Sequence, residues 1–586
     1  MLRARRLPVQ GNGRRAVRTA RWHDSPLRPC THSRNDTLPP TTDLGFGSTV
    51  LSRLRHISVS VFQLRLLVAV LMFAAVNGTY WSRATEAFAG SPGHLVQYSV
   101  AAFGVILFSI ALFTPPKTER WSLAILLVLG AVASYFLDYL GAVIDRDMIH
   151  NAMTTTKNEA RHLLTFAFLS HVAIYGILPA SVLLLLPIRK SSLVRATIGW
   201  AGSIVLAFLI FGASLAADFK TMSSLIREHR ELDTALIPFK PLEGMVSFAR
   251  QTYQTANMTF SPIGTDAQKG PRLLAAKKPL LALVVLGETS RAANWELGGY
   301  GRNTNPELGA RDIIYYPDVS ACGTSTAVSL PCMFAGYGSA NHSYKAFLSQ
   351  ENLLDVFKHA GFKVRWIDNN TGDLKIGARI DAALIKPKDD PKACARGECE
   401  DSVFLPLLDE ILATTTEDTV LVYHQIGSHG PAYFMRYPDG FKPFQPDCRS
   451  PDFGKCTNAE IVNAYDNTIA YTDLMLSRII DRMAAQDRVI TSLLYISDHG
   501  ESLGENGLYL HAAPLFLAPP EQTKVPMLMW LSQGYQTAFG VTRECLAQDA
   551  AAPRSHDNVF HTLLGLADVQ TQERDDSFDL TVPCRP

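Results

Sequence analysis

Charge is scarce in this sequence. Lys, Arg, Asp and Glu make up 19% of its 586 residues, against about 25% in typical soluble domains, and the deficit lies in the first two fifths of the chain. The formal net charge is only +1, so the composition does not support nucleic-acid binding, which needs an excess of basic residues. At this length we expect two or three domains.

Cysteine is absent between Cys30 and Cys322. The eight cysteines that follow are even in number and mostly close in sequence, which is typical of disulfides formed in an oxidising compartment. A structural zinc site is the alternative, but only Cys394 and Cys399 approach the ligand spacing of such sites. We therefore predict three local disulfides and a fourth by elimination: Cys322–Cys332, Cys394–Cys399, Cys448–Cys456 and Cys545–Cys584.

Apolar stretches, in contrast, are long and numerous. Five follow one another, and each is near the length of about 20 residues that spans a bilayer. Arg65 lies near the start of the first and is expected to reach the interface; apart from Arg65 and Asp138, few ionisable residues interrupt the stretches, which argues against a channel or sensor. The five predicted spans are 59–81, 95–113, 121–144, 163–188 and 196–217.

The segment before the first span is basic. Residues 1–58 hold eleven Arg and no apolar periodicity, and we interpret them as a disordered tail able to lie on a membrane surface. A translation start near Val50 or Leu51 is the alternative. Because basic segments stay inside, the tail is expected in the cytoplasm. Five spans then place everything after residue 217 outside, in the compartment that the cysteines also indicate.

Two further segments complete the chain. Residues 218–275 are polar, carry helical patterning and are interrupted by prolines; we interpret them as a linker with helices on the membrane surface. Residues 276–586 alternate apolar strands with helical segments, which predicts one large α/β domain.

Two apolar runs in this domain end in polar side chains. Residues 280–286 lead to Glu288, and residues 492–497 lead to Asp498 and His499. Such runs are typical of strands buried on both faces, and in α/β sheets the chemistry lies just past the carboxyl ends of the strands. We therefore predict one metal site assembled from distant segments.

Imidazoles strengthen this prediction. A third strand-like segment, 422–431, contains His424 and His429. His511 follows His499 in a Gly-rich loop. A single His is usually structural, but several imidazoles beside Asp498 favour a site for a metal and a phosphate.

A hydroxyl-rich turn lies between Cys322 and Cys332. Thr324, Ser325 and Thr326 precede an apolar segment, and a turn leading into a helix can present a nucleophile beside the helix N-terminus, which favours anionic substrates. The alternative is a helix cap closed by a disulfide. The residues alone do not choose among the three hydroxyls.

The runs 287–291, 322–333, 428–433 and 497–505 together resemble the lipid A phosphoethanolamine transferases. This family includes the mobile colistin-resistance enzymes and belongs to the alkaline-phosphatase superfamily. The resemblance covers about residues 60–586 and excludes the tail. It implies a five-helix transmembrane domain in the bacterial inner membrane and a periplasmic α/β domain of alkaline-phosphatase/sulfatase-like fold.

The resemblance also assigns residues to roles. It implies Thr326 as the nucleophile and one Zn²⁺, with a second possible, held by Glu288, Thr326, Asp498 and His499. His429 and His511 would bind the transferred phosphate or the second metal. The remaining implied substrate-binding residues are Asn370, Thr371 and Lys375 in one segment, and Asn151, Thr155 and Glu159 in the loop between the third and fourth spans.

Asn151, Thr155 and Glu159 stand at i, i+4 and i+8, which predicts one helix face. The resemblance makes this face part of the donor site, with Glu159 pairing the ethanolamine ammonium. The alternative is a solvated loop helix.

The implied reaction transfers phosphoethanolamine from phosphatidylethanolamine to lipid A through phospho-Thr326, which lowers the negative surface charge and polymyxin binding. Alternatives are another acceptor (a core sugar, a periplasmic glucan or a protein) and a phosphoglycerol transferase or phosphatase of the same superfamily. A sulfatase is disfavoured because the run after Cys322 lacks the Cys-x-Pro-x-Arg pattern. We expect a monomer surrounded by membrane lipids, with no nucleic-acid partner.

Overall fold

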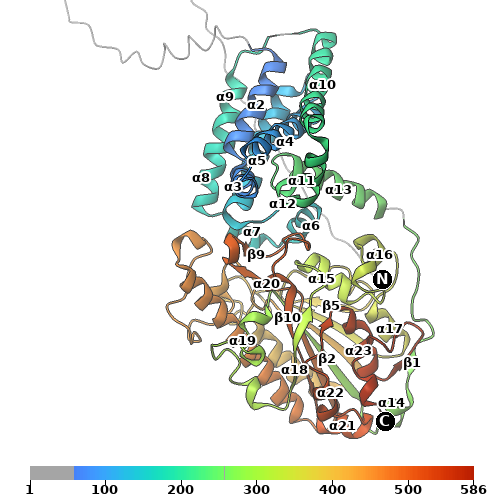
Figure 1. Ribbon diagram of the computed structural model, residues 1–586. Coiled ribbons are helices and arrows are strands. Elements are labelled where there is room, and N and C mark those ends of the chain that lie inside the picture. Colours follow the sequence, from blue (N-terminus) through green and yellow to red (C-terminus); the bar gives the residue numbers. More distant parts are fainter. Residues whose placement is uncertain (1–58, 190, 256–257, 586) are drawn as a thin grey trace, which may run out of the picture. The chain divides into compact units, whose positions relative to one another are not determined.

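The computed structural model describes residues 59–189, 191–255 and 258–585. The predicted basic tail, 1–58, lies outside these residues. The described chain has a helical part up to residue 255 and an α/β part that follows it (Figure 1). The helices of the first part are α2 (Val61–Ala75), α3 (Gly78–Ala87), α4 (Pro92–Leu112), α5 (Glu119–Leu140), α6 (Arg146–Thr154), α7 (Lys157–Leu163), α8 (Phe166–Val172), α9 (Leu178–Leu185), α10 (Leu193–Ala217), α11 (Phe219–Glu228), α12 (Arg230–Thr234) and α13 (Phe239–Thr255).

Four helical segments among the described residues are long and apolar enough to span a membrane: α4, α5, Phe166–Leu185 and α10. The predicted first span, 59–81, is not one straight helix, because α2 and α3 are bent by 65°. The buried Asn77 stabilises the bend: its side chain donates to the carbonyls of Met72 and Ile237 and accepts from the Ile237 amide. A fifth span exists only if the bent pair counts as one.

The predicted fourth span, 163–188, is continuous over Phe166–Leu185 but contains a π-helical turn, Ala173–Ile177. Pro179 follows in the first turn of α9. A proline lacks the amide hydrogen that an α-helix uses, so a widened turn before it lets the span continue.

Arg65, near the start of the predicted first span, is held by other helices of the bundle. Its side chain is fully buried between helices and donates to Thr114 Oγ1 at 2.9 Å and to the Thr114 carbonyl at 2.7 Å. Glu119 lies 3.8 Å from its guanidinium. A buried Arg needs such partners in a low-dielectric bundle. Here they engage Nε and Nη2, while Nη1 has no hydrogen-bond partner among the described residues.

The segment predicted as a linker divides between the two parts. Leu232, Leu236 and Leu242, from α12, the turn after it and α13, belong to the apolar core of the helical part. Residues 268–275 instead form β1 and α14 of the α/β part, so that part begins before residue 276. The membrane-surface position of α11–α13 remains a prediction.

A mixed eight-stranded sheet forms the centre of the α/β part, in the order β11-β3-β10-β7-β2-β6-β4-β5. The strands β7, β2, β6, β4 and β5 are parallel, and β10 is antiparallel to both of its neighbours. The strands of this part are β1 (Gln268–Lys269), β2 (Leu280–Gly287), β3 (Ile314–Ser320), β4 (Lys363–Asp368), β5 (Asp381–Leu384), β6 (Thr419–His424), β7 (Ile490–Ser497), β8 (Ser502–Leu503), β9 (Tyr509–Leu510), β10 (Lys524–Leu531), β11 (Arg554–Ser555) and β12 (Val569–Gln570).

Helices cover both faces of this sheet (Figure 1). Every residue of β2 is buried, and its side chains alternate between two apolar cores, one on each face. Burial on both faces explains the continuous apolar run in the sequence. The helices are α14 (Pro271–Ala275), α15 (Thr326–Met333), α16 (Tyr344–Leu348), α17 (Leu353–His359), α18 (Phe404–Thr414), α19 (Asn458–Ala484), α20 (Pro520–Thr523), α21 (Gln533–Phe539), α22 (Arg543–Gln548) and α23 (Asp557–Leu566).

All four predicted cysteine pairs are bonded in the structure, including Cys545–Cys584, which joins residues 39 apart in sequence. All four bonds lie in the α/β part, and five of the eight cysteines are buried.

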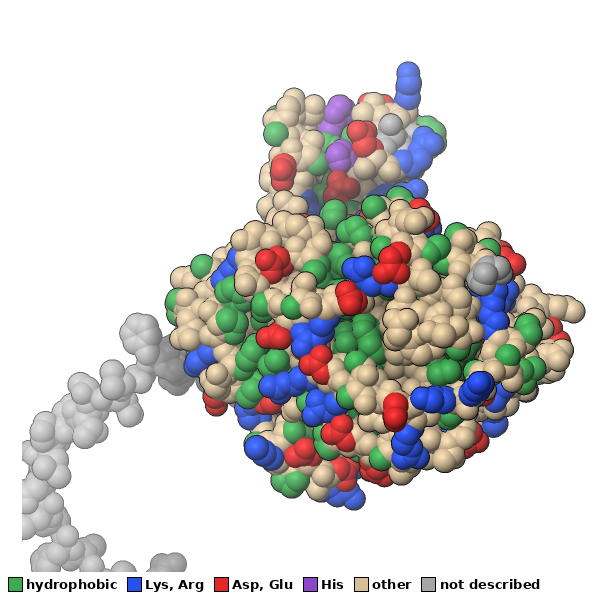
Figure 2. Space-filling model, turned by 90° about the horizontal axis from the view of Figure 1, so that it is seen from below, with side chains coloured by type: hydrophobic (Ala, Val, Ile, Leu, Met, Phe, Trp, Pro, Cys, Tyr) green, Lys and Arg blue, Asp and Glu red, His purple; other side chains and the backbone are tan. Residues whose placement is uncertain are grey.

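The surface of the α/β part carries both signs of charge. Figure 2 shows Lys and Arg interspersed with Asp and Glu on the face seen from below, without a large patch of one sign. This face therefore offers no extended electrostatic surface for a polyanion.

Candidate active site

The ends of two neighbouring strands build the centre of the site. β2 and β7 pair in parallel with Gly287 opposite Ser497, so Glu288 and Asp498 follow at the same edge of the sheet. Glu288, Asp498 and His499 are fully buried, and each offers a ligand atom within 4.8 Å of the others. The prediction that distant segments meet in one site is therefore correct.

Asp498 has one oxygen without a hydrogen bond. Its Oδ1 accepts hydrogen bonds from the amides of Thr289 and His499 at 3.0 and 2.8 Å. The buried Oδ2 has no hydrogen-bond partner among the described residues, and His499 Nε2 lies 3.3 Å from it. Burial, together with the charge of Glu288, raises the pKa of Asp498 to about 6. Buried polar atoms are normally satisfied, and two carboxylates with one imidazole are a donor set that suits a divalent cation such as Zn²⁺.

Thr326 is the hydroxyl that faces this centre. It is the first residue of α15, and its Oγ1 lies 3.1 and 3.2 Å from the Glu288 carboxylate oxygens and 3.3 Å from His499 Nε2. Thr324 instead donates to the Ala513 carbonyl at 2.7 Å. Ser325 is the N-cap residue of α15, without a capping bond from its side chain. The geometry thus selects Thr326 from the three hydroxyls that the sequence left open.

Asn370 supports Glu288 in the structure. Its Nδ2 donates to Glu288 Oε2 at 2.7 Å and to the Gln425 carbonyl at 3.1 Å. Thr371 lies beside it with a buried hydroxyl that has no partner among the described residues. Lys375 is exposed farther along the same loop. Of the three residues implied for phosphate binding, Asn370 is the one that bonds Glu288.

Sequence reasoning assigned no individual role to His424, the last residue of β6. It pairs in register with Leu286 of β2, which places its imidazole beside the next residues of that strand. Its Nδ1 lies 2.7 Å from Asp368 Oδ2 and its Nε2 lies 3.7 Å from Glu288 Oε2. Asp368 thus orients His424, and His424 in turn supports the Glu288 carboxylate. A signal was present for His424, which lies in a predicted strand-like segment, but not for Asp368.

His429 and His511 lie together on the open side of the centre. The rings of His499 and His511 are 4.4 Å apart, and those of His429 and His511 are 5.8 Å apart. His511 Nδ1 is 2.8 Å from Glu501 Oε2. These positions agree with a role in holding an anionic group that Thr326 carries.

Asn151, Thr155 and Glu159 do not share one helix face as predicted. Helix α6 ends at Thr154, Thr155 has extended backbone, and Thr156 caps α7 by bonding the Glu159 amide. A threonine whose side chain accepts a hydrogen bond from a backbone amide favours the start of a new helix, here α7. The three side chains nevertheless line one cavity of about 340 Å³, together with His429 and His511.

We call this space the apolar cavity, because α5, α6 and α13 otherwise line it with aliphatic and aromatic side chains such as Val132, Phe136 and Met245. Its polar end contains Glu159, whose Oε1 lies 3.3 Å from His429 Nε2. Burial favours the neutral form of each group, but their mutual attraction prevails: the pKa of Glu159 is lowered and that of His429 is raised to about 9.

Comparisons with known proteins agree with this architecture. A family model described as phosphoethanolamine transferase EptA/EptB matches residues 100–253, and a sulfatase model matches residues 281–569. Phosphoethanolamine transferase EptA of Escherichia coli K12 is 36% identical over 540 residues, which cover 91% of this chain and 98% of that protein. The chain belongs to the phosphoethanolamine transferase EptA family.

Two other members are similar over most of their length. Phosphatidylethanolamine transferase Mcr-1 of Escherichia coli is 33% identical over 528 residues, which cover 87% of this chain and 96% of that one. The integral membrane lipooligosaccharide phosphoethanolamine transferase A of Neisseria meningitidis superposes with a TM-score of 0.86 at 31% identity, covering 90% of this chain and all of that structure. The family and the sulfatase-like fold predicted from the motifs are confirmed. Like its relatives, this transferase is an inner-membrane protein with a C-terminal periplasmic domain.

Proposed function

We propose that this transferase moves phosphoethanolamine from phosphatidylethanolamine to lipid A through a covalent intermediate on Thr326. The observation that carries the proposal is the position of Thr326 Oγ1, within 3.1–3.3 Å of Glu288 and His499. A hydroxyl is a poor nucleophile unless neighbouring groups take up its proton or stabilise its charge. Relatives named for phosphatidylethanolamine and lipooligosaccharide support the donor and the acceptor class.

The donor fits the apolar cavity. Side chains of the helical part form the aliphatic walls of the cavity, which suit acyl chains. The polar end of the cavity contains Glu159, His429 and His511. A carboxylate there can pair with the ethanolamine ammonium, and imidazoles can bind the phosphate. The phosphorus then lies beside Thr326.

In the first displacement the Thr326 oxygen forms a bond to phosphorus, and the bond from phosphorus to the diacylglycerol oxygen breaks. Glu288 accepts the hydrogen bond of the attacking hydroxyl. The proton that Thr326 gives up balances the proton that diacylglycerol takes up.

In the second displacement an oxygen of the acceptor attacks the same phosphorus, and the bond to Thr326 breaks. Thr326 regains a proton, and phosphoethanolamine leaves on the acceptor. Splitting the transfer in this way lets one site serve a lipid donor and a chemically different acceptor in turn.

Glu288, Asp498 and His499, with Thr326 as a further oxygen ligand, would hold one Zn²⁺. The Asp498 Oδ2 without a hydrogen bond and the oxygen and nitrogen donors support this assignment. A bound Zn²⁺ supplies a positive charge that lowers the pKa of a ligated hydroxyl and offsets charge in the transition state. The protein contributes the ligand positions, which Asn370 and His424 support.

The test is mass spectrometry of lipid A from cells that express the chain or its Thr326→Ala variant. Lipid A should gain one phosphoethanolamine mass only with the wild type. Unmodified lipid A alongside another phosphoethanolamine-bearing glycan or protein would instead support a different acceptor.

A further inference from the structure

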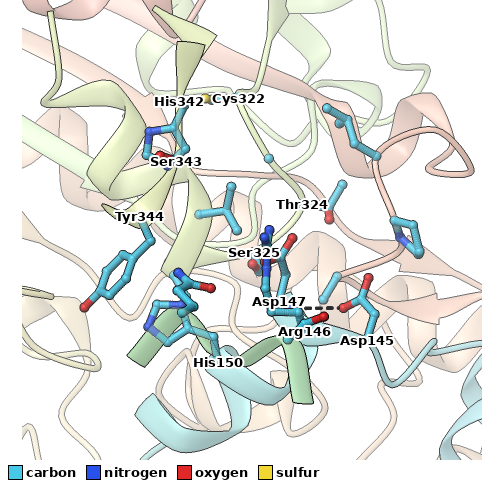
Figure 3. A pocket seen from close by; sticks show the side chains of 18 of the residues that line it. Asp145, Arg146, Asp147, His150, Cys322, Thr324, Ser325, His342, Ser343 and Tyr344 are labelled. Atoms are coloured by element: carbon cyan, nitrogen blue, oxygen red, sulfur yellow. Dashed lines mark hydrogen bonds and ion pairs between the residues drawn. The ribbon is translucent and has the colours of Figure 1, made fainter. Parts of the chain in front are cut away.

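Two cavities adjoin the nucleophile Thr326, and both are lined from the helical and the α/β parts. One is the apolar cavity. The other has a volume of about 600 Å³, and Figure 3 shows Arg146 and His150 of α6 across it from Thr324 and Ser325. Both spaces belong to the active site because of this position. A third space lies within the helical part alone.

This third space, which we call the α4–α10 groove, has a volume of about 300 Å³ and mostly apolar walls. None of the described residues that line it lines either cavity beside the nucleophile. α4 and α10 form its sides. α11, α12 and the start of α13 follow the periplasmic end of α10 and cover the groove there. The lining residues are Tyr98, Ala101, Ala102, Gly104, Val105, Phe108, Ala207, Phe208, Phe211, Ile226, Asp233, Leu236 and Phe239.

The two helices that form the groove are in direct backbone contact. A Cβ atom added at Gly104 of α4 would lie 3.0 Å from the Phe211 amide nitrogen and 3.1 Å from the Ala207 carbonyl oxygen of α10. Small residues permit this close approach between membrane helices. The rings of Phe108 and Phe208 also pack with centroids 5.1 Å apart. The separation of the helices is therefore fixed, and the groove cannot close by moving α4 towards α10.

The length of the groove suits one acyl chain. Its α4 residues run from Tyr98 to Phe108, which at 1.5 Å per residue is about 15 Å. This is about half of the ~30 Å hydrocarbon thickness of a bilayer, the depth that a chain from one leaflet occupies. Phe208 is 60% exposed, so the groove opens towards the surrounding lipid.

Two opposite charges stand at the periplasmic end of the groove. Asp233 lines it, and Arg230 precedes Asp233 by three residues in α12, a spacing that places both side chains on one helix face. Neither side chain has an ion pair or hydrogen bond in the part of the chain that the structure describes. The nearby cation Lys240 pairs instead with Glu243 at 3.0 Å. One carboxylate and one guanidinium are therefore left for a ligand.

These charges match the head of an aminophospholipid. In phosphatidylethanolamine a two-carbon link separates the phosphate from the ammonium, so Arg230 can bind the phosphate while Asp233 binds the ammonium. An ammonium donates hydrogen bonds to a carboxylate, whereas the trimethylammonium of phosphatidylcholine has no hydrogen to donate. Phosphatidylglycerol has no cation in its head. The pair therefore favours phosphatidylethanolamine over both.

We propose that the α4–α10 groove binds a phosphatidylethanolamine molecule of the periplasmic leaflet as a resident lipid, distinct from the lipid that reacts. One acyl chain lies between α4 and α10, and the head lies on Arg230 and Asp233. Phe239 in the groove and Met245 in the apolar cavity both belong to α13, so the resident lipid supports a wall of the apolar cavity. The inference concerns binding alone and does not depend on the transfer chemistry.

The experiment maps bound lipid by photo-cross-linking. The full chain in detergent, as the Thr326→Ala variant so that lipid is not cleaved, is incubated with phosphatidylethanolamine that carries a photoreactive group midway along an acyl chain. Mass spectrometry should find label on α4 and α10 from the groove, and on α5 and α6 from the apolar cavity. Asp233→Asn should reduce the label on α4 and α10 about 3- to 5-fold, as expected for one partly exposed charge pair, and Asp233→Asn with Arg230→Gln about 10-fold.

The label on α5 and α6 is the internal control, because a variant that fails to fold would lose it as well. Glu228→Gln is the matched variant, since Glu228 is an exposed acid of α11 that does not line the groove, and it should leave the label on α4 and α10 unchanged. A phosphatidylglycerol probe with the same acyl chain should label α4 and α10 about 3-fold less, because it has no ammonium for Asp233.

Equal label on α4 and α10 with and without the Asp233→Asn substitution would overturn the inference, because the groove would then hold any lipid chain. Equal label from the phosphatidylglycerol probe would overturn it for the same reason. If α4 and α10 are labelled selectively while α5 and α6 are not labelled at all, the groove is supported and the proposed donor site fails.

Discussion

The carboxylate of Glu159 and the imidazole of His429 meet at 3.3 Å across the junction between the helical and α/β parts. Glu159 is at the same time fixed to its own helix, because its other oxygen accepts the Thr156 amide. The apolar cavity, which we propose as the donor site, is thus lined from both parts, and its polar end contains an ion pair between them.

This pair predicts a pH-dependent contribution to stability. Because the pKa of His429 is raised to about 9, the pair contributes its full stability below pH 6.5, and this stability is lost as the pH rises through about 9. Because the pKa of Glu159 is lowered, the same stability is also lost as the pH falls below 4.5. Glu159→Gln should cost about 1–3 kcal/mol at pH 5–6.5. Melting temperatures of the variant and the wild type should converge towards pH 10.

Glu243→Gln is the matched control, because Glu243 pairs with Lys240 on the exposed surface of α13. It should change the melting temperature little. A difference between wild type and Glu159→Gln that is the same at every pH would contradict the ion-pair account.

The Asp498 oxygen without a hydrogen bond predicts the effect of removing that carboxylate. Asp498→Asn should lower the metal content of the purified chain and its activity together, as measured by elemental analysis and transfer assays. Asp473→Asn is a suitable control, since Asp473 is equally buried but accepts the Glu307 and Leu308 amides. Full zinc content in Asp498→Asn would remove Asp498 from the ligand set.

The hydrogen bond from Asn370 to Glu288 predicts a supporting role that is distinct from ligation. Asn370→Ala should retain the metal but bind it about 10- to 100-fold more weakly, as is usual when a group that orients a ligand is lost. Competition with a chelator would measure this affinity. Unchanged affinity with impaired donor binding would instead support the phosphate-binding role that the family resemblance implied.

The disulfides predict graded losses of stability. In the chain-entropy description, the Cys545–Cys584 bond, which joins residues 39 apart, contributes about 4 kcal/mol, against about 2 kcal/mol for Cys394–Cys399. Replacing both cysteines of each pair with Ser should therefore lower the unfolding temperature more for the first pair. The reverse order would show that local packing dominates.

Much of this molecule follows from local patterns. β2 and β7 are visible as apolar runs because both faces are buried, and the chemistry beyond their ends follows from parallel pairing. Three disulfides follow from the proximity of their cysteines in the sequence, and Cys545–Cys584 follows by elimination. The choice of Thr326 needed either the family resemblance or the structure, because only the fold shows which hydroxyl faces Glu288.

Features that depend on distant partners were missed. The bend at Asn77 is stabilised by Ile237, 160 residues away. Arg65 can be buried because its guanidinium donates a hydrogen bond to Thr114. The separation of α6 from α7 arises from the capping hydroxyl of Thr156, which competes with the helical period of Asn151, Thr155 and Glu159. Periodicity alone cannot weigh such contacts.

The mass of the peptide that contains Thr326 tests the central claim most directly. The purified chain is incubated with labelled phosphatidylethanolamine in the absence of an acceptor, digested and analysed. Wild type should carry phosphoethanolamine on Thr326, Thr326→Ser should carry it to a lower extent, and Thr326→Ala should carry none. An equal adduct in Thr326→Ala, on Thr324 or Ser325, would contradict the assignment of the nucleophile.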